Sequence, residues 1–566
     1  MKMSWRGILF VLSSIVSAVT AISALNRNSV FDIYSDSIAP IEVVGRKFYN
    51  SRTGNQFFLR GVAYQPTIAS ESWNPEILNS ETNYIDPLAE PSLCLRDLPF
   101  FEKLDVNTLR VYSIDTRKNH DVCMEALANS GIYVLIDLSE PNHSIERNRP
   151  SWDISIFERY TSVVDVMQKY SNVLGFFAGN EVTNDETNTN ASPFVKAAIR
   201  DVKQYIQEKS YRQIPVGYSS SDDATTRDSL AKYFACGGET AADFYGINMY
   251  EWCGYSSYAT SGYRERTLEF ANYPIPVFFS EFGCNSVRPR PFTEVSAIFG
   301  PKMSQVWSGG LAYMYFEEEN EYGLVKIDET GSVHELEDFK YLQNAYRNTS
   351  PYGITKEKYL QDISFAISTQ SVECPNEVSA ANTHTPWKAN VEIPPSPNAK
   401  ICQCLEQVLP CLVSPLNGWN FQDHFDYACS QVDCSDITTD GEKGIYGEFS
   451  YCLPEQKLSL EISKMYHMRN HPTGVCPMSS NNVYYNAQSM NITDPMCIEV
   501  SHRLQELQKA ADSRKTPAVK KLVKPKMKNA SHTKLLLDTD SGSSVKFKYS
   551  GYAILLISII FATMVF

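Results

Sequence analysis

Two short segments decide the fold, Leu174-Gly-Phe-Phe-Ala-Gly-Asn-Glu181 and Pro276-Val-Phe-Phe-Ser-Glu281. Each is an apolar stretch, typical of a buried strand, that leads directly into a glutamate. Carboxylates that act on one bond need rigid supports, and the carboxyl ends of parallel barrel strands provide them. The glutamates are 100 positions apart, which matches three βα units of roughly 30 residues each. We therefore expect Glu181 at the end of a fourth strand and Glu281 at the end of a seventh.

The residues around these segments repeat one order: an apolar strand, a polar loop and an amphipathic helix. Apolar positions in 157–170 and 193–208 have the spacing of helices with one buried face. Strict alternation of strands and helices predicts a (β/α)8 barrel, a TIM barrel, with its site at the carboxyl ends of the strands. The expected strands are residues 57–64, 107–113, 132–138, 173–181, 214–218, 244–249, 277–281 and 311–316.

Length and composition bound the number of domains and the class of partner. The 566 residues exceed what one hydrophobic core usually organises, so a second, smaller domain is expected. A content of 43% hydrophobic and 20% charged residues is that of a globular protein. The net charge of −14 argues against a nucleic-acid partner. No motif calls for a cofactor.

The composition changes after the expected barrel domain, which covers residues 24–375. Residues 376–400 are rich in proline and poor in apolar runs, which suits a semi-rigid linker. Residues 401–500 hold eight cysteines, the sign of a small domain stapled by disulfides. Residues 501–542 follow as a stalk whose lysines are expected to be solvated.

The cysteines indicate an oxidising compartment, because their number, 14, is even in a chain with export signals. Cys253 and Cys284 lie just beyond the sixth and seventh expected strands, so a bridge between them would brace the loops beside Glu281. Zinc at Cys402 and Cys404 is the competing interpretation, but the spacings lack a repeated CxxC pair and we expect no metal. The cysteines expected in disulfides are Cys94, Cys123, Cys236, Cys253, Cys284, Cys374, Cys402, Cys404, Cys411, Cys429, Cys434, Cys452, Cys476 and Cys497.

Both ends of the chain have the pattern of processing signals. Residues 1–23 place basic residues before an apolar stretch and small residues, as in a cleaved secretory signal, with an uncleaved anchor as the alternative. The apolar tail 553–566 is short for a membrane span. Small residues, a polar spacer and this tail predict that a glycosylphosphatidylinositol (GPI) anchor replaces residues 543–566, attached at Gly542 or the neighbouring Ser541. A short spanning segment is the alternative.

Export also allows N-glycosylation, which requires an Asn-x-Ser/Thr sequence without proline at the middle position. The motif is common by chance, so we do not expect all sites to be used. The acceptors are Asn142, Asn190, Asn348, Asn491 and Asn529.

The two glutamates fit glycoside chemistry with retention, in which one carboxyl protonates the leaving oxygen and the other attacks the opposite face of the sugar. We assign Glu181 as proton donor and Glu281 as nucleophile; either one alone could be a helix cap or ion pair. Asn180 is expected to bind the hydroxyl next to the reacting carbon. Tyr250 and Arg110 are expected to bind Glu281, and Arg110 to lower its pKa. Both could instead belong to a buried structural network.

Polysaccharide binding also needs flat apolar surfaces for pyranose rings, and tyrosines recur at the expected strand ends. Packing explains each of them as well as sugar contact does. These tyrosines are Tyr64, Tyr112, Tyr250, Tyr313 and Tyr322.

Five motifs together are more specific than either glutamate. They are Phe58-Leu-Arg-Gly-Val-Ala-Tyr-Gln65, Leu109-Arg-Val-Tyr112, Ala178-Gly-Asn-Glu-Val182, Asn248-Met-Tyr-Glu-Trp252 and Phe279-Ser-Glu-Phe-Gly-Cys284. They closely resemble the landmarks of glycoside hydrolase family 72, the fungal β-1,3-glucanosyltransferases of the yeast Gas type. The resemblance covers nearly the whole mature chain. The segment from Cys402 to Cys497 resembles the family 43 carbohydrate-binding module of the longer subfamily.

The resemblance implies a retaining barrel enzyme with Glu181 as acid/base and Glu281 as nucleophile. It also implies a set of cleft residues that bind substrate: Gln65, Tyr112, Asn180, Tyr250, Tyr313 and Tyr322.

The implied reaction is internal cleavage of β-1,3-glucan, with one part held as an ester on Glu281 and passed to the non-reducing end of another β-1,3-glucan chain. The expected protein is a monomer, GPI-anchored at the outer face of the plasma membrane and present in the cell wall. A plain β-1,3-glucan hydrolase shares every catalytic residue and differs in whether water or sugar resolves the ester. A catalytically silent wall-binding protein would lack one of the glutamates, and both are present.

Overall fold

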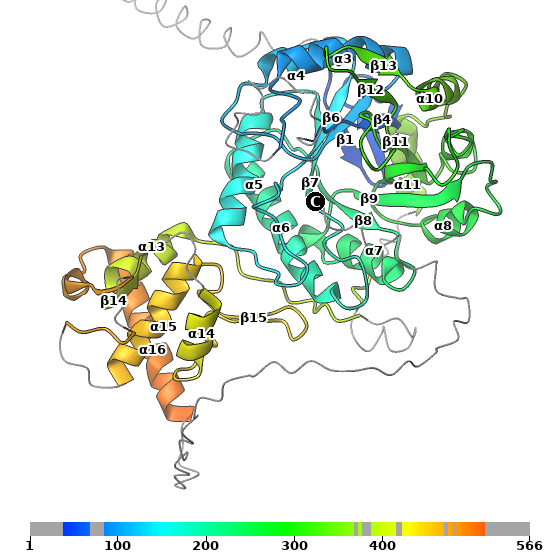
Figure 1. Cartoon of the computed structure of the whole chain (residues 1–566). Coiled ribbons are helices and arrows are strands. Elements are labelled where there is room, and N and C mark those ends of the chain that lie inside the picture. The colour runs from blue at the N-terminus through cyan, green and yellow to red at the C-terminus, as the bar shows by residue number, and fades with distance from the viewer. Residues whose placement is uncertain are drawn as a thin grey trace, which may run out of the picture.

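The structure is a computed structural model, and it describes residues 38–67, 84–366, 372–375, 387–414, 421–468, 474–478 and 482–514. Figure 1 shows a large barrel with a smaller, mainly helical module beside it. The expected signal at 1–23, the GPI signal and most of the stalk lie outside the described residues. Within the described part, no helix has the length and apolar character that crossing a membrane requires.

Eight parallel strands close into a barrel, as the sequence predicts. Their sequence order is also their order around the barrel, so each strand lies beside its neighbour in the chain. The strands are β4 (Leu59–Ala63), β5 (Thr108–Val111), β6 (Tyr133–Asp137), β7 (Val173–Asn180), β8 (Val216–Ser221), β9 (Tyr245–Cys253), β10 (Val277–Cys284) and β11 (Trp307–Ala312).

The eighth strand differs from the expectation of 311–316, because β11 begins four residues earlier, at Trp307. Trp307 is fully buried and packs on Phe279 of β10, with ring centroids 4.5 Å apart. Gly309 has a φ of +98°, and a Cβ there would lie 2.2 Å from the Leu59 carbonyl oxygen. Glycine has low strand propensity, so the sequence pattern hid a strand that needs glycine for its close approach to β4.

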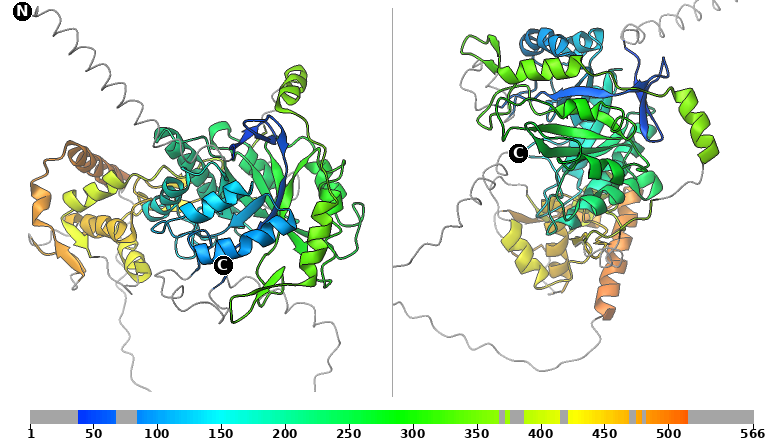
Figure 2. Two further views of the ribbon diagram at one scale, coloured as in Figure 1. Left: turned by 90° about the horizontal axis from the view of Figure 1, so that it is seen from above. Right: turned by 90° about the vertical axis from the view of Figure 1, so that its right-hand side faces the viewer.

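Helices surround the barrel (Figures 1 and 2). The two helices expected at 157–170 and 193–208 are present as α5 and α6, with the first displaced by three residues. The barrel helices are α3 (Pro91–Leu104), α4 (Asp121–Asn129), α5 (Ile154–Met167), α6 (Ser192–Glu208), α7 (Arg227–Ala235), α8 (Tyr263–Glu269), α9 (Val295–Ile298) and α10 (Glu337–Arg347). The hairpin β12 (Val325–Ile327) and β13 (Val333–Glu335) precedes α10, and α11 (Lys356–Ala366) follows it.

A small antiparallel sheet packs against the starts of the barrel strands. It consists of β1 (Ile41–Val44), β2 (Lys47–Asn50) and β3 (Gln56–Phe57). Phe48 from β2 contacts the rings of Phe244 and Phe278, at centroid distances of 6.1 and 6.0 Å. These contacts fill the amino-terminal end of the barrel with apolar side chains, which leaves the chemistry to the carboxyl ends.

The module folds from four main helices and short strand pairs. Its elements are α13 (Ala399–Val408), β14 (Cys411–Val413), α14 (Phe421–Cys429), β15 (Thr439–Asp440), β16 (Ile445–Tyr446), α15 (Pro454–Met468), β17 (Val483–Tyr485) and α16 (Pro495–Arg514). The extended residues 387–398 connect it to the barrel and pack on the barrel surface, where Trp387 is buried against Tyr233.

All 14 cysteines are paired, in seven disulfides. Cys253 is joined to Cys284, which links the ends of β9 and β10. Cys402 and Cys404 are bonded to Cys452 and Cys497, so the alternative of a zinc site at these residues is wrong. The other bridges are Cys94–Cys123, Cys236–Cys374, Cys411–Cys476 and Cys429–Cys434.

Candidate active site

Glu181 directly follows β7, the fourth barrel strand, and Glu281 lies in β10, the seventh. Asn248 of β9 is the register partner of Glu281 and hydrogen-bonds the carboxylate of Glu181. The charge of Glu181 also acts on the ionisation of Glu281. Two acids from distant parts of the sequence therefore meet at one place, at the carboxyl ends of the strands.

Three donors hold the carboxylate of Glu281, which is only 8% exposed. Its Oε1 accepts hydrogen bonds from Arg110 Nη1 at 3.2 Å and from the Tyr112 hydroxyl at 2.8 Å. Its Oε2 accepts one from the Tyr250 hydroxyl at 2.8 Å. Both oxygens are thus fixed in direction, which suits a group that must attack one atom along one line.

Arg110 lowers the pKa of Glu281, as expected, but the net shift of that pKa is upward. Burial of the carboxyl raises the pKa of Glu281 to about 7 and outweighs the opposing effects of Arg110, Tyr112 and Tyr250. Arg110 also bonds Asp137, at 3.0 Å, so its positive charge is divided between two carboxylates. Burial likewise raises the pKa of both tyrosines, which keeps their hydroxyls protonated as donors.

Glu181 has a different environment, with fewer donors and more exposure. Asn248 Nδ2 donates to Glu181 Oε1 at 2.8 Å and to Asn180 Oδ1 at 3.2 Å. The backbone of Glu181 is left-handed, with a φ of +49°, a conformation that non-glycine residues rarely adopt. Its N–H donates to the Ser219 carbonyl at 2.9 Å, and its carbonyl accepts from Arg147 Nη2 at 2.8 Å.

The expected cleft residues fall into two groups. Tyr112, Asn180, Tyr250, Tyr313 and Tyr322 are all partly exposed. Three of the rings form one aromatic cluster, since Tyr322 contacts Tyr250 and Tyr313 at centroid distances of 5.9 and 5.3 Å.

Gln65 is buried, and its amide is engaged with the backbone. Its Oε1 accepts from the N–H groups of Tyr112 and Ser113, both at 3.0 Å, and its Nε2 donates to the Ile85 carbonyl at 2.6 Å. The amide thereby fixes the chain around Tyr112. Tyr64 is fully buried and bonds Asp97, so of the two alternatives for this residue the structure supports packing and not sugar contact.

Sequence reasoning missed the polar network beneath the two glutamates. Asn248 Oδ1 accepts from Ser219 Oγ at 3.1 Å and from Ser280 Oγ at 2.8 Å. These bonds orient the Asn248 amide so that its Nδ2 faces Asn180 and Glu181. The available signal was the position of Asn248, a lone polar residue in the otherwise apolar expected strand 244–249.

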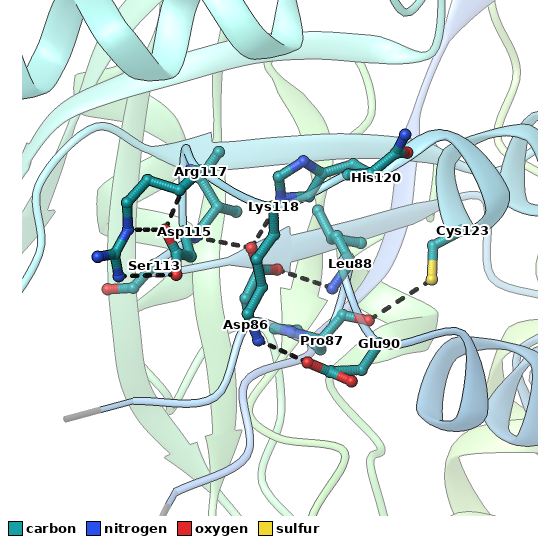
Figure 3. Close-up of polar contacts among 12 residues, drawn as sticks. Asp86, Pro87, Leu88, Glu90, Ser113, Asp115, Arg117, Lys118, His120 and Cys123 are labelled. Atoms are coloured by element: carbon teal, nitrogen blue, oxygen red, sulfur yellow. Dashed lines mark hydrogen bonds and ion pairs between the residues drawn. The ribbon is translucent and has the colours of Figure 1, made fainter. Parts of the chain in front are cut away.

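The loop after β5, which begins at Tyr112, is anchored by buried acids (Figure 3). Asp86 Oδ2 accepts from the Asp115 N–H and contacts His120 Nε2, both at 2.7 Å. Asp115 in turn pairs with Arg117, at 3.0 Å. Because backbone and side-chain groups share these acids, the loop has one preferred conformation, and Tyr112 is held at its start.

The remaining predicted sites lie on the surface or outside the described residues. Asn142, Asn348 and Asn491 are exposed, whereas Asn190 is half-buried. Asn529 and the GPI site Gly542 lie outside the described residues. In the described part, one group of side chains has metal-ligand spacing, Cys404, Asp494 and Cys497, and two of these three form a disulfide.

Comparisons with known proteins agree with this geometry. Residues 31–350 match the glycoside hydrolase family 72 profile, described as glucanosyltransferase, and residues 409–483 match the X8 domain. The chain is 52% identical over 527 residues to the 1,3-beta-glucanosyltransferase GAS2 of Saccharomyces cerevisiae, covering 92% of this chain and 93% of the relative. It is 42% identical over 456 residues to the 1,3-beta-glucanosyltransferase gas1 of Schizosaccharomyces pombe, covering 80% of each.

Solved structures extend the comparison to three dimensions. A glutamate-to-glutamine mutant of Saccharomyces cerevisiae Gas2p, in complex with laminaritetraose and laminaripentaose, superposes with a TM-score of 0.74 and 54% identity. The match covers 83% of this chain and 99% of that one. The chain therefore belongs to glycoside hydrolase family 72, the glucanosyltransferases, and its module contains an X8 domain.

Proposed function

We propose that this protein is a retaining β-1,3-glucanosyltransferase, which cleaves a β-1,3-glucan internally and joins the new reducing end to the non-reducing end of another β-1,3-glucan. The observation that carries the proposal is the unequal treatment of the two glutamates. Glu281 receives three donors, which suits a nucleophile that must be ionised, whereas the described partners of the Glu181 carboxylate amount to Asn248.

In the first step, a Glu281 oxygen attacks the anomeric carbon and the glycosidic bond breaks. Glu181 gives its proton to the departing oxygen, which leaves with the reducing-end fragment. Asn180 supports this step: its Oδ1 is occupied by Asn248, so its amide N–H is directed to the sugar hydroxyl beside the reacting carbon.

In the second step, the Glu181 carboxylate takes a proton from a hydroxyl at the non-reducing end of the acceptor. That oxygen attacks the anomeric carbon, the ester bond to Glu281 breaks, and a β-linked product forms with retention. The cluster of Tyr250, Tyr313 and Tyr322 supports binding of the glucan chain, because pyranose faces pack on aromatic rings. Tyr112 and Gln65 serve the same site, Gln65 by fixing the backbone of Tyr112.

A plain β-1,3-glucan hydrolase is the alternative, in which water resolves the ester. Incubation of the purified protein with reduced laminari-oligosaccharides distinguishes the two. We expect products longer than the substrate, whereas shorter products alone would overturn transfer in favour of hydrolysis.

The location of the enzyme is part of the proposal. A cleaved signal at 1–23 and a GPI anchor at Gly542 would place a monomer at the outer face of the plasma membrane and in the cell wall, where its glucan substrates are. Phosphatidylinositol-specific phospholipase C should release the protein from membranes. Recovery of the 553–566 peptide from the mature protein by mass spectrometry would contradict the anchor.

A further inference from the structure

The X8 module and its linker contact the barrel next to the loop that carries Glu181. The module reaches the barrel through the β15–β16 hairpin, which points toward α6 in Figure 1. Phe194 at the start of α6 packs edge-on against Tyr446 of β16, with ring centroids 5.7 Å apart. The start of a barrel helix follows the end of a strand, so this contact lies on the catalytic face.

The same hairpin meets the backbone of the Glu181 loop directly. Gly441 lies against Asn190, and a Cβ at Gly441 would lie 2.1 Å from the Asn190 carbonyl oxygen. The linker adds a second contact, because the Lys388 N–H donates to Thr189 Oγ1 at 2.9 Å. The Asn390 N–H then donates to the Gly441 carbonyl at 2.9 Å, which joins the linker to the hairpin.

In the loop that follows β7, hydrogen bonds run from this contact back to Thr183. Thr183, two residues after Glu181, contacts Ser192 Oγ at 2.8 Å and the Asn188 carbonyl at 3.3 Å. Asn188 Oδ1 also accepts from the Asn184 N–H, at 3.0 Å. The loop from 181 to 192 is therefore cross-linked to itself, and its far end is the part that the linker and hairpin hold.

A second connection runs through the loop after β6. Arg147 in that loop bonds the carbonyl of Glu181 at 2.8 Å. The loop ends at Ile154, the first residue of α5, whose N–H donates to the Tyr451 carbonyl of the module at 3.0 Å. Ile154 is also buried in an apolar cluster made otherwise of module residues.

We propose that the docked module and linker brace the loop of the proton donor, with Arg147 as a positioning residue that holds Glu181 in its left-handed backbone conformation. A left-handed glutamate costs energy, so it persists only where its surroundings hold it. The module supplies those surroundings from two sides, at Ile154 and at 189–194. This inference rests on the proposed function, because it assigns the brace to the acid/base step.

The test separates proton donation from nucleophilic attack. A glucan donor needs Glu181 to protonate the leaving oxygen, whereas laminaribiosyl fluoride has a leaving group that departs with little acid assistance. Arg147→Met and Gly441→Ala should lower kcat on laminari-oligosaccharides by about tenfold or more. Fluoride release in the first turnover should stay within about threefold of the wild type, because the surroundings of Glu281 are unchanged.

Matched controls come from the same two segments. Arg149→Met removes an exposed arginine of the same loop, which pairs at 3.9 Å with Glu146. Glu442→Ala changes the exposed neighbour of Gly441. Both should match the wild type with either donor. Covalent labelling of Glu281 by a 2-deoxy-2-fluoro-laminaribiosyl fluoride counts the intact sites, so rates are compared per site.

Each outcome of this experiment supports or overturns the proposed brace. Equal losses with both donors would mean general damage to the barrel, and no loss with either donor would mean that the module does not act on Glu181; both overturn the brace. If the Gly441→Ala variant is poorly secreted, the Arg147→Met variant alone tests the brace. Wild-type protein without transfer on laminari-oligosaccharides, but with normal fluoride release, would contradict the proposed function and not the brace, which is measured as a ratio between variants.

Discussion

The barrel and the module are stabilised in different ways. The barrel domain has one large apolar core and a smaller cluster around Phe48, and its three disulfides join neighbouring elements, as Cys94 of α3 is joined to Cys123 of α4. The module divides its apolar residues between two small clusters and has four disulfides between residues 402 and 497. A small domain buries too little apolar surface to be stable by itself, so disulfides supply the stability that a larger core would give. The comparison teaches that the large apolar core lets the barrel tolerate buried polar residues and a strained backbone at its candidate site, whereas the module depends on its disulfides to hold its fold.

The largest expected effect is the loss of transfer activity, without loss of stability, when either glutamate of the barrel is replaced. Glu281→Gln and Glu181→Gln are nearly isosteric, yet an amide can neither attack nor donate the proton. We expect transfer on laminari-oligosaccharides to fall about a thousandfold, with an unchanged melting temperature.

Added azide should affect the activities of the Glu181 and Glu281 variants differently. Azide should partly rescue a Glu181 substitution with an activated donor, and should not restore transfer with β configuration to Glu281→Gln. The control is Glu329→Gln, an exposed glutamate of the same domain. Normal transfer in either catalytic variant would overturn the assignment.

Removal of the module should impair folding of the barrel, even though the barrel has an apolar core of its own. A chain that ends at residue 375 exposes apolar side chains that the linker and module cover, including Ile154, Phe194 and Tyr233. Exposed apolar patches favour retention and aggregation, so we expect poor secretion, measured as protein in the medium. A well-folded 24–375 fragment with full activity would show that the two domains are independent.

Loss of a disulfide should cost more in the module than in the barrel. Replacing Cys404 and Cys497 by serine removes a bridge that spans 93 residues of a small domain, with an expected cost of about 2–5 kcal/mol. Replacing Cys94 and Cys123 removes a 29-residue bridge beside a large core and should cost less. Urea unfolding followed by tryptophan fluorescence measures both. If both double variants lost the same free energy of unfolding, the two domains would not differ in their dependence on disulfides.

Much of this comparison could be predicted from the sequence. Strands with a continuous apolar run, such as Val173–Asn180, give a clear pattern, and so do Glu181 and Glu281 at the strand ends. The glycine-rich β11 (Trp307–Ala312) was predicted four residues late, because its pattern depends on close backbone approach and not on side chains. The resemblance to a known family added Gln65 to the cleft residues that the strand-end pattern already indicated.

Features that depend on packing were beyond the sequence. The sign of the pKa shift of Glu281 depends on how completely the carboxyl is buried, and a contact with Arg110 alone suggested the opposite sign. Asn248 gained its role through Ser219 and Ser280, which lie on other strands. The contact of Gly441 with the Glu181 loop joins residues far apart in sequence, and no local pattern predicts it.

The smallest expected effect concerns pH. As the proposed nucleophile, Glu281 must be ionised to attack, and burial raises its pKa to about 7, so we expect activity to be lost as pH falls through that pKa. The Tyr250 hydroxyl donates to the charged form and lowers the pKa, so Tyr250→Phe should raise it further. The acid limb of kcat/KM should move to higher pH by about one unit. Tyr112→Phe should act in the same direction through Oε1, whereas Tyr258→Phe, outside this network, should leave the limb in place. A limb that moves to lower pH in Tyr250→Phe would show that another group sets it, and would remove the hydroxyl from the control of the nucleophile.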